Sequence, residues 1–204
     1  MNMFDKNSTC SAATTVELPK LLIIGHARHG KDTVCDIICS EFACTFRSSS
    51  DFCAEKFIYS ALKHKYNYTT YTQCFEDRHN HRAEWYDMIH DYCRDDYARL
   101  GREIFAENSI YCGLRNKSEF HAMRNTQVFD HAIWVDRCNH LPVEDRSSMS
   151  LEIWMADYVI DNNGTLEDLK RNTRELVKRL VVNHQLATQN LTLIGRLRSY
   201  GTQF

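Results

Sequence analysis

The first clear pattern in the chain is an apolar run followed by a glycine-rich loop and a periodic helix. Residues 21–24 are all leucine or isoleucine, which is typical of a strand buried on both faces of a parallel sheet. Apolar residues then recur at helical spacing through 34–42. This spacing predicts an amphipathic helix from Thr33 to about Glu41.

Four further apolar runs alternate with helical patterns along the chain. They predict strands at 43–47, 109–114, 132–135 and 158–160. Strands that alternate with helices are typical of a parallel sheet covered by helices on both faces. We therefore predict an α/β fold with a doubly wound parallel sheet.

Helical patterns account for most of the remaining sequence. Helices are predicted at 52–65 and 94–106, and the aromatic and charged stretch 66–108 should cap one edge of the sheet. Thr165 is predicted to cap the last helix, because Asp168 three residues later completes a variant of the capping box.

The chain length allows one catalytic domain. With 204 residues it can form a single α/β domain with a sizeable core. We place this domain at 20–182, after a leader at 1–19 and before a C-terminal extension at 183–204 that has no clear period and stays unassigned. No apolar stretch has the length of a membrane helix, so we expect no membrane partner and a cytoplasmic protein.

Net charge and cysteine spacing argue against three classes of protein: broad nucleic-acid binders, disulfide-linked proteins and zinc proteins. The net charge of −2 argues against a broad basic surface that holds nucleic acid. The nine cysteines form no CxxC pair, which favours reduced thiols over a disulfide framework or a zinc site.

The loop after the first strand fits the phosphate-binding pattern GxxxxGK. Its glycines let the backbone turn and close around a phosphate chain, and the following helix offers unpaired N–H groups. We expect ATP to bind here, and Arg28 either touches the nucleotide or faces water. The predicted nucleotide-binding residues are Gly25, His26, Ala27, Arg28, His29, Gly30, Lys31, Asp32 and Thr33.

Phosphoryl transfer depends on positioning and on neutralising the charge that develops. We predict Lys31 as the main catalytic residue, with its ammonium on the β- and γ-phosphates. A Mg²⁺ ion should bridge the phosphates near Thr33 or Asp32, and the sequence does not choose between them. Asp136 ends the strand 132–135 and either holds Mg²⁺ through water or only terminates the strand.

Two arginines are candidates for binding an acceptor phosphate. If residues 75–85 open a helix, Arg78 and Arg82 lie four apart on one face, where their guanidinium groups could clamp a phosphate. The alternative is a solvated helix in which both arginines pair with Asp77 and Glu84.

Asp51 and Arg146 are further catalytic candidates. Asp51 follows the second predicted strand and either acts as general base for the acceptor or caps the helix that starts at Phe52. Arg146 lies in the polar stretch 141–148, which is expected to act as a mobile lid and to bring this arginine onto the phosphates.

Three segments together resemble a known family. The loop 25–33 with GKDT at its end, the strand 110–115 followed by Glu119, and the closing run 156–169 are similar to deoxynucleoside monophosphate kinases of tailed bacteriophages. The resemblance covers about 20–182, with gaps in the middle. It implies a P-loop nucleoside or nucleotide kinase fold, with ATP and Mg²⁺ as cofactors.

The resemblance also implies an acceptor site. Arg115 and Glu119 match an Arg-x-x-x-Glu element that lies beside the acceptor in those kinases, although Gly113 stands where they usually have a carboxylate. The implied reaction moves the γ-phosphate of ATP to a deoxynucleoside monophosphate, in the host cytoplasm if the protein is phage-encoded.

Two other functions stay open. Related phage kinases phosphorylate the hydroxymethyl group of 5-hydroxymethyluracil in DNA, which makes modified DNA the alternative partner to a small nucleotide. A nucleotide-binding or nucleotide-hydrolysing switch without an acceptor is the third hypothesis. The oligomeric state is not predicted.

Overall fold

Five parallel strands form the central sheet of the protein. The computed structural model describes residues 17–146 and 148–200, with side chains described as far as residue 190. The strands lie in the order β2-β3-β1-β4-β5, and each neighbouring pair is parallel. They are β1 (Leu21–Ile24), β2 (Phe46–Ser48), β3 (Ile110–Cys112), β4 (His131–Asp136) and β5 (Tyr158–Asp161). The predicted doubly wound α/β sheet is therefore confirmed.

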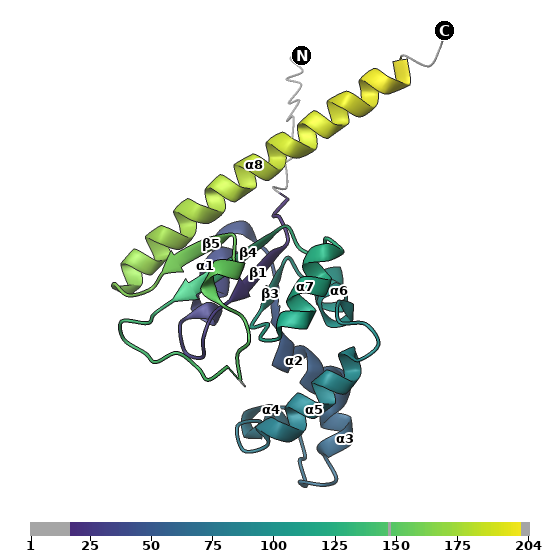
Figure 1. Cartoon of the computed structure of the whole chain (residues 1–204), viewed down its shortest axis with the longest axis vertical. Helices are drawn as coiled ribbons and strands as arrows, with labels where there is room; N and C mark the ends of the chain where they lie inside the picture. Colours follow the sequence, from purple (N-terminus) through teal and green to yellow (C-terminus); the bar gives the residue numbers. More distant parts are fainter. Residues whose placement is uncertain (1–16, 147, 201–204) are drawn as a thin grey trace, which may run out of the picture.

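Both faces of the sheet are buried, which explains the uninterrupted apolar run of β1. Leu22 and Ile24 pack into one core, and Leu21 and Ile23 pack into the other. Successive side chains of a strand point to opposite faces, so a strand covered on both sides needs apolar residues at every position. Helices α1 (Lys31–Phe42) and α8 (Leu166–Tyr200) contribute apolar residues to the second of these cores (Figure 1).

The other face is covered by the helices between β2 and β4. Three of them, α3, α4 and α5, form a lobe at the end of the molecule away from α8 (Figure 1). The elements are α2 (Ser49–Cys53), the π-helical η1 (Ala54–Ile58), α3 (Tyr59–Leu62), α4 (Tyr71–Asp77), α5 (Arg82–Cys93), α6 (Arg99–Glu107) and α7 (Lys117–Asn125). A short 3₁₀ turn, η2 (Ile153–Met155), precedes β5.

Local caps move several element boundaries away from their predicted places. The helix predicted to start at Phe52 begins at Ser49, because the Ser48 hydroxyl accepts the Asp51 N–H at 3.2 Å. Asp51 therefore lies inside the first turn, and the prediction that it caps this helix is wrong. The strand predicted at 43–47 is shifted to β2, because Ala43 is left-handed (φ 50°) and closes α1.

Two helices differ from prediction where an Asp or Asn side chain accepts a nearby backbone N–H group. The helix predicted at 94–106 begins only at Arg99, after a turn in which the Asp96 carboxylate accepts the Ala98 N–H at 3.1 Å. Helix α7 was not predicted, and Asn116 caps it by accepting the Ser118 N–H at 2.8 Å. Such caps satisfy the N–H groups that the first turn of a helix leaves unpaired.

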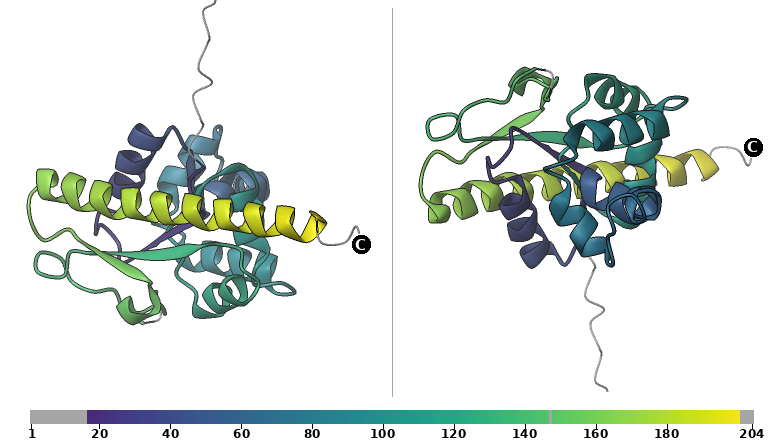
Figure 2. Two further views of the ribbon diagram at one scale, coloured as in Figure 1. Left: turned by 90° about the horizontal axis from the view of Figure 1, so that it is seen from above. Right: turned by 90° about the horizontal axis from the view of Figure 1, so that it is seen from below.

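The last helix is longer than predicted. Its predicted cap is confirmed: Thr165 Oγ1 accepts the Asp168 N–H at 3.2 Å, and Asp168 Oδ2 accepts the Thr165 N–H at 3.0 Å. The helix continues without a break to Tyr200, so most of the unassigned stretch 183–204 is helical, and its end projects beyond the sheet (Figure 2). Across the described ranges, no helix is both long enough and apolar enough to span a bilayer.

Candidate functional site

The phosphate-binding loop connects the end of β1 to the start of α1. Gly25 has φ of 139°, and a Cβ there would lie 2.5 Å from the carbonyl oxygen of Val135 in β4. Gly30 has φ of 93°, and a Cβ there would lie 2.4 Å from Nδ2 of Asn162. Both glycines of the motif are therefore required by backbone conformation and by close contact with the neighbouring strands.

A pair of alanine variants tests this packing. Gly113 has φ of 89°, but a Cβ there would meet nothing within 4 Å. Gly113→Ala should therefore lower the free energy of unfolding by only ~1–2 kcal/mol, the conformational cost of a residue with a Cβ at positive φ. Gly25→Ala adds a backbone clash and should lower the free energy of unfolding by about 2–3 kcal/mol more. Urea denaturation of both variants measures the difference, and equal losses would show that β4 yields to the added methyl group.

Lys31 lies at the mouth of the loop, where a phosphate chain would enter. Its residue is 8% exposed, and Nζ donates to the His26 carbonyl at 2.6 Å. Burial lowers the pKa of Lys31, and the nearby charges of Arg115 and Asp32 also act on it. A buried ammonium that donates to a loop carbonyl can exchange that partner for phosphate oxygens.

The imidazole of His29 is part of the loop's scaffold. The residue is fully buried, and its Nδ1 accepts the Arg137 N–H at 3.1 Å. Asn162 Nδ2 donates to the His29 carbonyl at 2.9 Å. Burial lowers the pKa of His29, which favours the neutral ring that accepts this bond. His29 therefore ties the loop to the residues that follow β4 and β5, through its side chain and its carbonyl respectively.

The other two polar side chains of the loop face in different directions. His26 packs edge-on against Trp134 with 5.2 Å between ring centroids, and burial lowers its pKa. Arg28 is exposed and has φ of 63°.

Oxygen ligands suitable for Mg²⁺ surround the loop. Asp32 and Thr33 lie exposed on the first turn of α1. Asp136 ends β4, and its carboxylate accepts the Cys138 N–H and the Asn163 amide, each at 3.3 Å. Hard carboxylate and hydroxyl oxygens are the donors that Mg²⁺ prefers. These three residues therefore fit the predicted metal chemistry.

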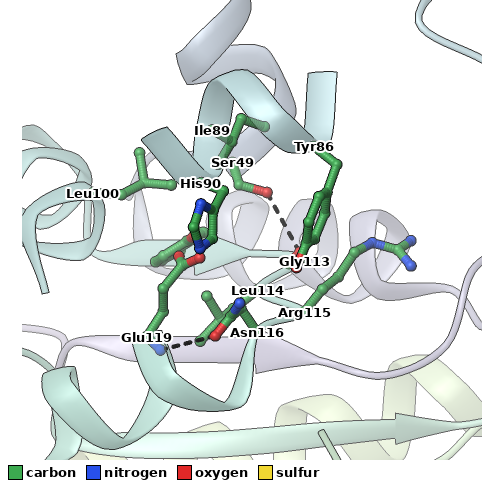
Figure 3. Close-up of a pocket in the computed structure, with 11 residues that line it drawn as sticks. Ser49, Tyr86, Ile89, His90, Leu100, Gly113, Leu114, Arg115, Asn116 and Glu119 are labelled. Atoms are coloured by element: carbon green, nitrogen blue, oxygen red, sulfur yellow. Dashed lines mark hydrogen bonds between the residues drawn. The ribbon is translucent and has the colours of Figure 1, made fainter. Parts of the chain in front are cut away.

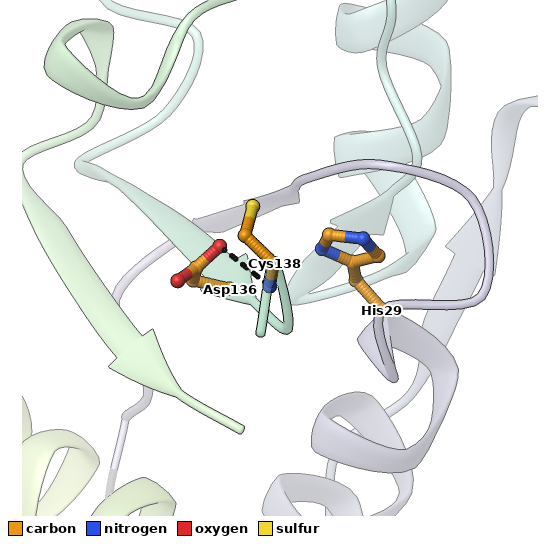
Figure 4. Close-up of side chains that lie close together, drawn as sticks. All are labelled: His29, Asp136 and Cys138. Carbon is orange, nitrogen blue, oxygen red and sulfur yellow. Dashed lines mark hydrogen bonds between the residues drawn. The ribbon is translucent and has the colours of Figure 1, made fainter. Parts of the chain in front are cut away.

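A cluster of one histidine, one aspartate and one cysteine lies near the loop, but it is poorly suited to bind a transition metal such as zinc. One donor atom each of His29, Asp136 and Cys138 lies within 4.8 Å of the others (Figure 4). The His29 Nδ1 faces this group, but its lone pair already accepts the Arg137 N–H. Coordination would break that bond and loosen the loop.

The two candidate clamp arginines lie on different elements. Arg78 follows the end of α4 and Arg82 begins α5, so the prediction that they share one helix face is wrong. The predicted pairing with acidic neighbours does not occur either, because Asp77 binds Asn80 and His81, and Glu84 binds Lys65 and Tyr66.

Arg78 nevertheless is held near the phosphate-binding loop, within electrostatic reach of Asp32. Its guanidinium stacks on the Phe75 ring at 3.9 Å and donates to the Phe75 carbonyl at 2.7 Å. Burial lowers its pKa, while Asp32 and Asp51 act on it electrostatically in the opposite sense. Arg78 thus lies in the field of Asp32, on the first turn of α1, and of Asp51 in α2. Arg82 is exposed and approaches His79, at 3.5 Å.

Asp51 is held by two partners at the base of a groove. The Arg47 Nε lies 2.6 Å from one carboxylate oxygen, and the Tyr71 hydroxyl donates to the other. Burial raises the pKa of Asp51 despite the opposing charge of Arg47. The groove is lined by Arg47, Asp51, Glu55, Tyr59 and Tyr71.

A small apolar pocket lies past the carboxyl ends of β2 and β3. Glu119 enters it from α7 and His90 from α5 (Figure 3). The Glu119 residue is 6% exposed, and no hydrogen bond to its carboxylate occurs within the described residues. Tyr111 also lines the pocket, and its buried hydroxyl finds no partner in the part of the chain described. Two polar groups without partners in an apolar pocket of about 90 Å³ are typical of a ligand site.

Glu119 should make the stability of the protein depend on pH. Burial raises its pKa to about 7, from an ordinary value of 4.5. The folded state then binds more protons than the unfolded state between these values, so stability is highest at low pH and falls as pH rises through 7. The loss should reach ~3 kcal/mol by pH 8. Denaturation at pH 5 and pH 8 measures it, and Glu119→Gln should abolish this part of the pH dependence.

Arg115 does not pair with Glu119. Its guanidinium points away from Glu119 (Figure 3) and lies 2.6 Å from the carboxylate of Glu144. The other Glu144 oxygen accepts the Ala27 N–H of the phosphate-binding loop at 2.6 Å. Arg146, predicted to move onto the phosphates, has a side chain 91% exposed that pairs with Glu152 at 3.9 Å. Glu144, from the same stretch 141–148, contacts the loop directly.

Sequence reasoning missed Glu144 and Asn162. Glu144 is one of several acidic residues in a polar stretch, and Asn162 lies in a turn where asparagine is common. Asn162 falls in the closing run 156–169, but nothing in that run or around Glu144 indicates that either side chain reaches the phosphate-binding loop.

Comparisons with known proteins place the chain among distant structural neighbours only. No protein-family model matches it, and no curated protein matches it. A shikimate kinase from Bacteroides thetaiotaomicron has a TM-score of 0.45 and 8% identity, covering 80% of this chain and 99% of that one. A gluconokinase from Sinorhizobium meliloti has a TM-score of 0.45 and 12% identity, covering 83% and 97%. A shikimate kinase from Acinetobacter baumannii in complex with shikimate has a TM-score of 0.45 and 14% identity, covering 82% and 96%. Because these TM-scores are low, the fold of the chain is assigned from its own sheet order and loop geometry.

Proposed function

We propose that this protein is an ATP-dependent phosphotransferase that moves the γ-phosphate to a deoxynucleoside monophosphate. The observation that carries the proposal is the adjacency of two sites. A phosphate-binding loop with a buried lysine follows β1, and a pocket with the partnerless Glu119 carboxylate follows the neighbouring strand β3. In open α/β sheets, ligands bind beyond the carboxyl ends of the strands.

The ATP side of the site uses backbone groups and one side chain. The N–H groups of the loop and of the first turn of α1 surround the phosphates, and Lys31 neutralises charge on the β- and γ-oxygens. Mg²⁺, when bound by Asp32, Thr33 and Asp136, supplies further neutralisation of the phosphate chain.

On the acceptor side, the pocket suits a flat group with hydrogen-bonding edges. A carboxyl group with a pKa near 7 exists in both protonation states at neutral pH, so Glu119 can donate or accept a hydrogen bond. A nucleobase edge offers both kinds of partner. Arg78, held in the field of Asp32 and Asp51, is placed to bind the acceptor phosphate.

A hydroxyl acceptor, such as the hydroxymethyl group of 5-hydroxymethyluracil in DNA, is the second candidate. The observation that favours it is Asp51, a partly buried carboxylate whose pKa is raised, as suits a general base. A monophosphate oxygen is already ionised at neutral pH and needs little help from a base, whereas a hydroxyl must lose its proton.

Replacing Asp51 with asparagine therefore separates the two acceptors. With a hydroxyl acceptor, Asp51→Asn should lower turnover ~10²–10⁴-fold. With a monophosphate acceptor, the loss should stay below about tenfold. Glu55→Gln is the matched control, because Glu55 also pairs with Arg47 and lines the same groove.

Direct assay tests the proposed function. ADP production from Mg-ATP is measured with each of the four deoxynucleoside monophosphates and with a duplex containing 5-hydroxymethyluracil, beside a Lys31→Ala control. Turnover with a monophosphate that the control lacks is the expected result. Phosphate transfer to the modified duplex alone would favour the second candidate. ATP hydrolysis indifferent to every acceptor would contradict both and leave a nucleotide-hydrolysing switch.

A further inference from the structure

A carboxylate from the connection between β4 and β5 lies on the phosphate-binding loop. Glu144 Oε2 accepts the Ala27 N–H at 2.6 Å, and Glu144 Oε1 lies 2.6 Å from Nη1 of Arg115. The backbone N–H of Glu144 in turn donates to Nδ1 of His26 at 3.2 Å. The Glu144 side chain is only 14% exposed, whereas the Arg115 side chain that pairs with it is 42% exposed.

The contacts of Glu144 are those that a phosphate group makes in a loop of this kind. One oxygen binds a loop N–H group and the other binds a guanidinium, and both donor types serve phosphate oxygens in such loops. Burial opposes ionisation of Glu144, but Arg115 and the Ala27 amide outweigh it and lower its pKa. The carboxylate is therefore an anion at neutral pH, next to the Lys31 ammonium that acts on it.

Other bonds hold the connection in place without this carboxylate. The Ser150 hydroxyl donates to the Arg115 carbonyl at 3.1 Å and accepts the Lys117 N–H at 2.9 Å. At the opposite end, the His140 ring contacts the Asn163 carbonyl at 2.7 Å. Removing the negative charge of Glu144 should therefore leave the fold intact.

We propose that Glu144 competes with nucleotide for the phosphate-binding loop. In the structure its carboxylate binds the Ala27 N–H and the Arg115 guanidinium. When the phosphates of a nucleotide enter, the carboxylate must leave, because two anions cannot share these donors at such short range. Its departure frees Arg115 to pair with the phosphate chain. This inference rests on the proposed binding of ATP to the loop.

The competition predicts that loss of the charge strengthens nucleotide binding. Glu144→Gln should bind a non-hydrolysable ATP analogue ~10-fold more tightly than the unsubstituted protein. Inorganic triphosphate should show the same gain, and adenosine, which has no phosphate, should show none. Isothermal titration calorimetry measures all three ligands.

Two further variants separate competition from general effects of charge and fold. Glu152→Gln removes an equal charge from the same connection, at a residue that contacts Arg146 and Trp154, and should leave the affinity unchanged. Glu144→Asp keeps the charge on a shorter side chain that reaches Ala27 less well, so it should show a smaller gain. This variant keeps the test decisive if Glu144→Gln does not fold.

The outcomes distinguish this inference from the proposed function. Unchanged or weaker binding by both Glu144 variants, beside normal binding by the unsubstituted protein, would overturn the competition and leave the kinase proposal standing. An equal gain for adenosine would also overturn it, because the effect would not involve phosphate. Absence of binding to every variant and to the unsubstituted protein would overturn both.

Discussion

Replacing Lys31 with alanine should remove nearly all phosphate transfer, with turnover reduced by ~10²–10³-fold or more. Lys31 is buried at the mouth of the loop, and its ammonium donates to the His26 carbonyl, a partner that it can exchange for phosphate oxygens. The loss arises because charge develops on the transferred group and Lys31 is the loop side chain that neutralises it.

The comparison for this variant is Lys56→Ala. Lys56 is an exposed lysine that lies over the Phe52 ring at 5.8 Å, and its loss should leave turnover unchanged. Circular dichroism of Lys31→Ala checks that the loop variant is folded. Near-normal turnover by a folded Lys31→Ala protein would mean that the loop does not bind the transferred phosphate.

The second large effect is expected at Arg78. Arg78→Ala should lower kcat/KM for the monophosphate acceptor ~10²-fold while the affinity for ATP stays the same. The stack on Phe75 and the bond to its carbonyl orient the guanidinium in advance, so little entropy is lost when it binds a phosphate. Charge-assisted hydrogen bonds of this kind contribute ~1.5–3 kcal/mol, which corresponds to about one to two powers of ten in rate.

Arg99 offers a closely matched control for that experiment. It stacks on the Tyr92 ring at 3.9 Å, as Arg78 does on Phe75, but it pairs with Glu103 on an exposed surface. Arg99→Ala should leave kcat/KM unchanged. Steady-state kinetics measure both variants, first with the acceptor varied at saturating ATP and then with ATP varied at saturating acceptor. If the only change in Arg78→Ala is a higher KM for ATP, Arg78 binds the nucleotide and not the acceptor.

The parts of the structure that the sequence predicted are those made by neighbours in the chain. Strand β1, the loop and helix α1 follow from an apolar run, two glycines and a helical period within about twenty residues. The cap formed by Thr165 and Asp168 was predictable for the same reason, because capping bonds join residues three apart. Errors of boundary arose where a single side chain, such as Ser48, ended or started an element.

The tertiary structure alone decided which distant residues meet at the loop. Glu144 reaches Ala27 across 117 positions, and Asn162 reaches His29 across 133. Parallel strands bring their carboxyl ends to one edge of the sheet, so the loops that follow β1, β3, β4 and β5 converge there whatever their separation in sequence. Periodicity reports which face of an element is buried, but it carries no information on which polar side chain of a converging loop will lie against another. For this protein the sequence therefore determined the phosphate-binding loop and its lysine, and the packing of the sheet determined that a carboxylate lies on that loop.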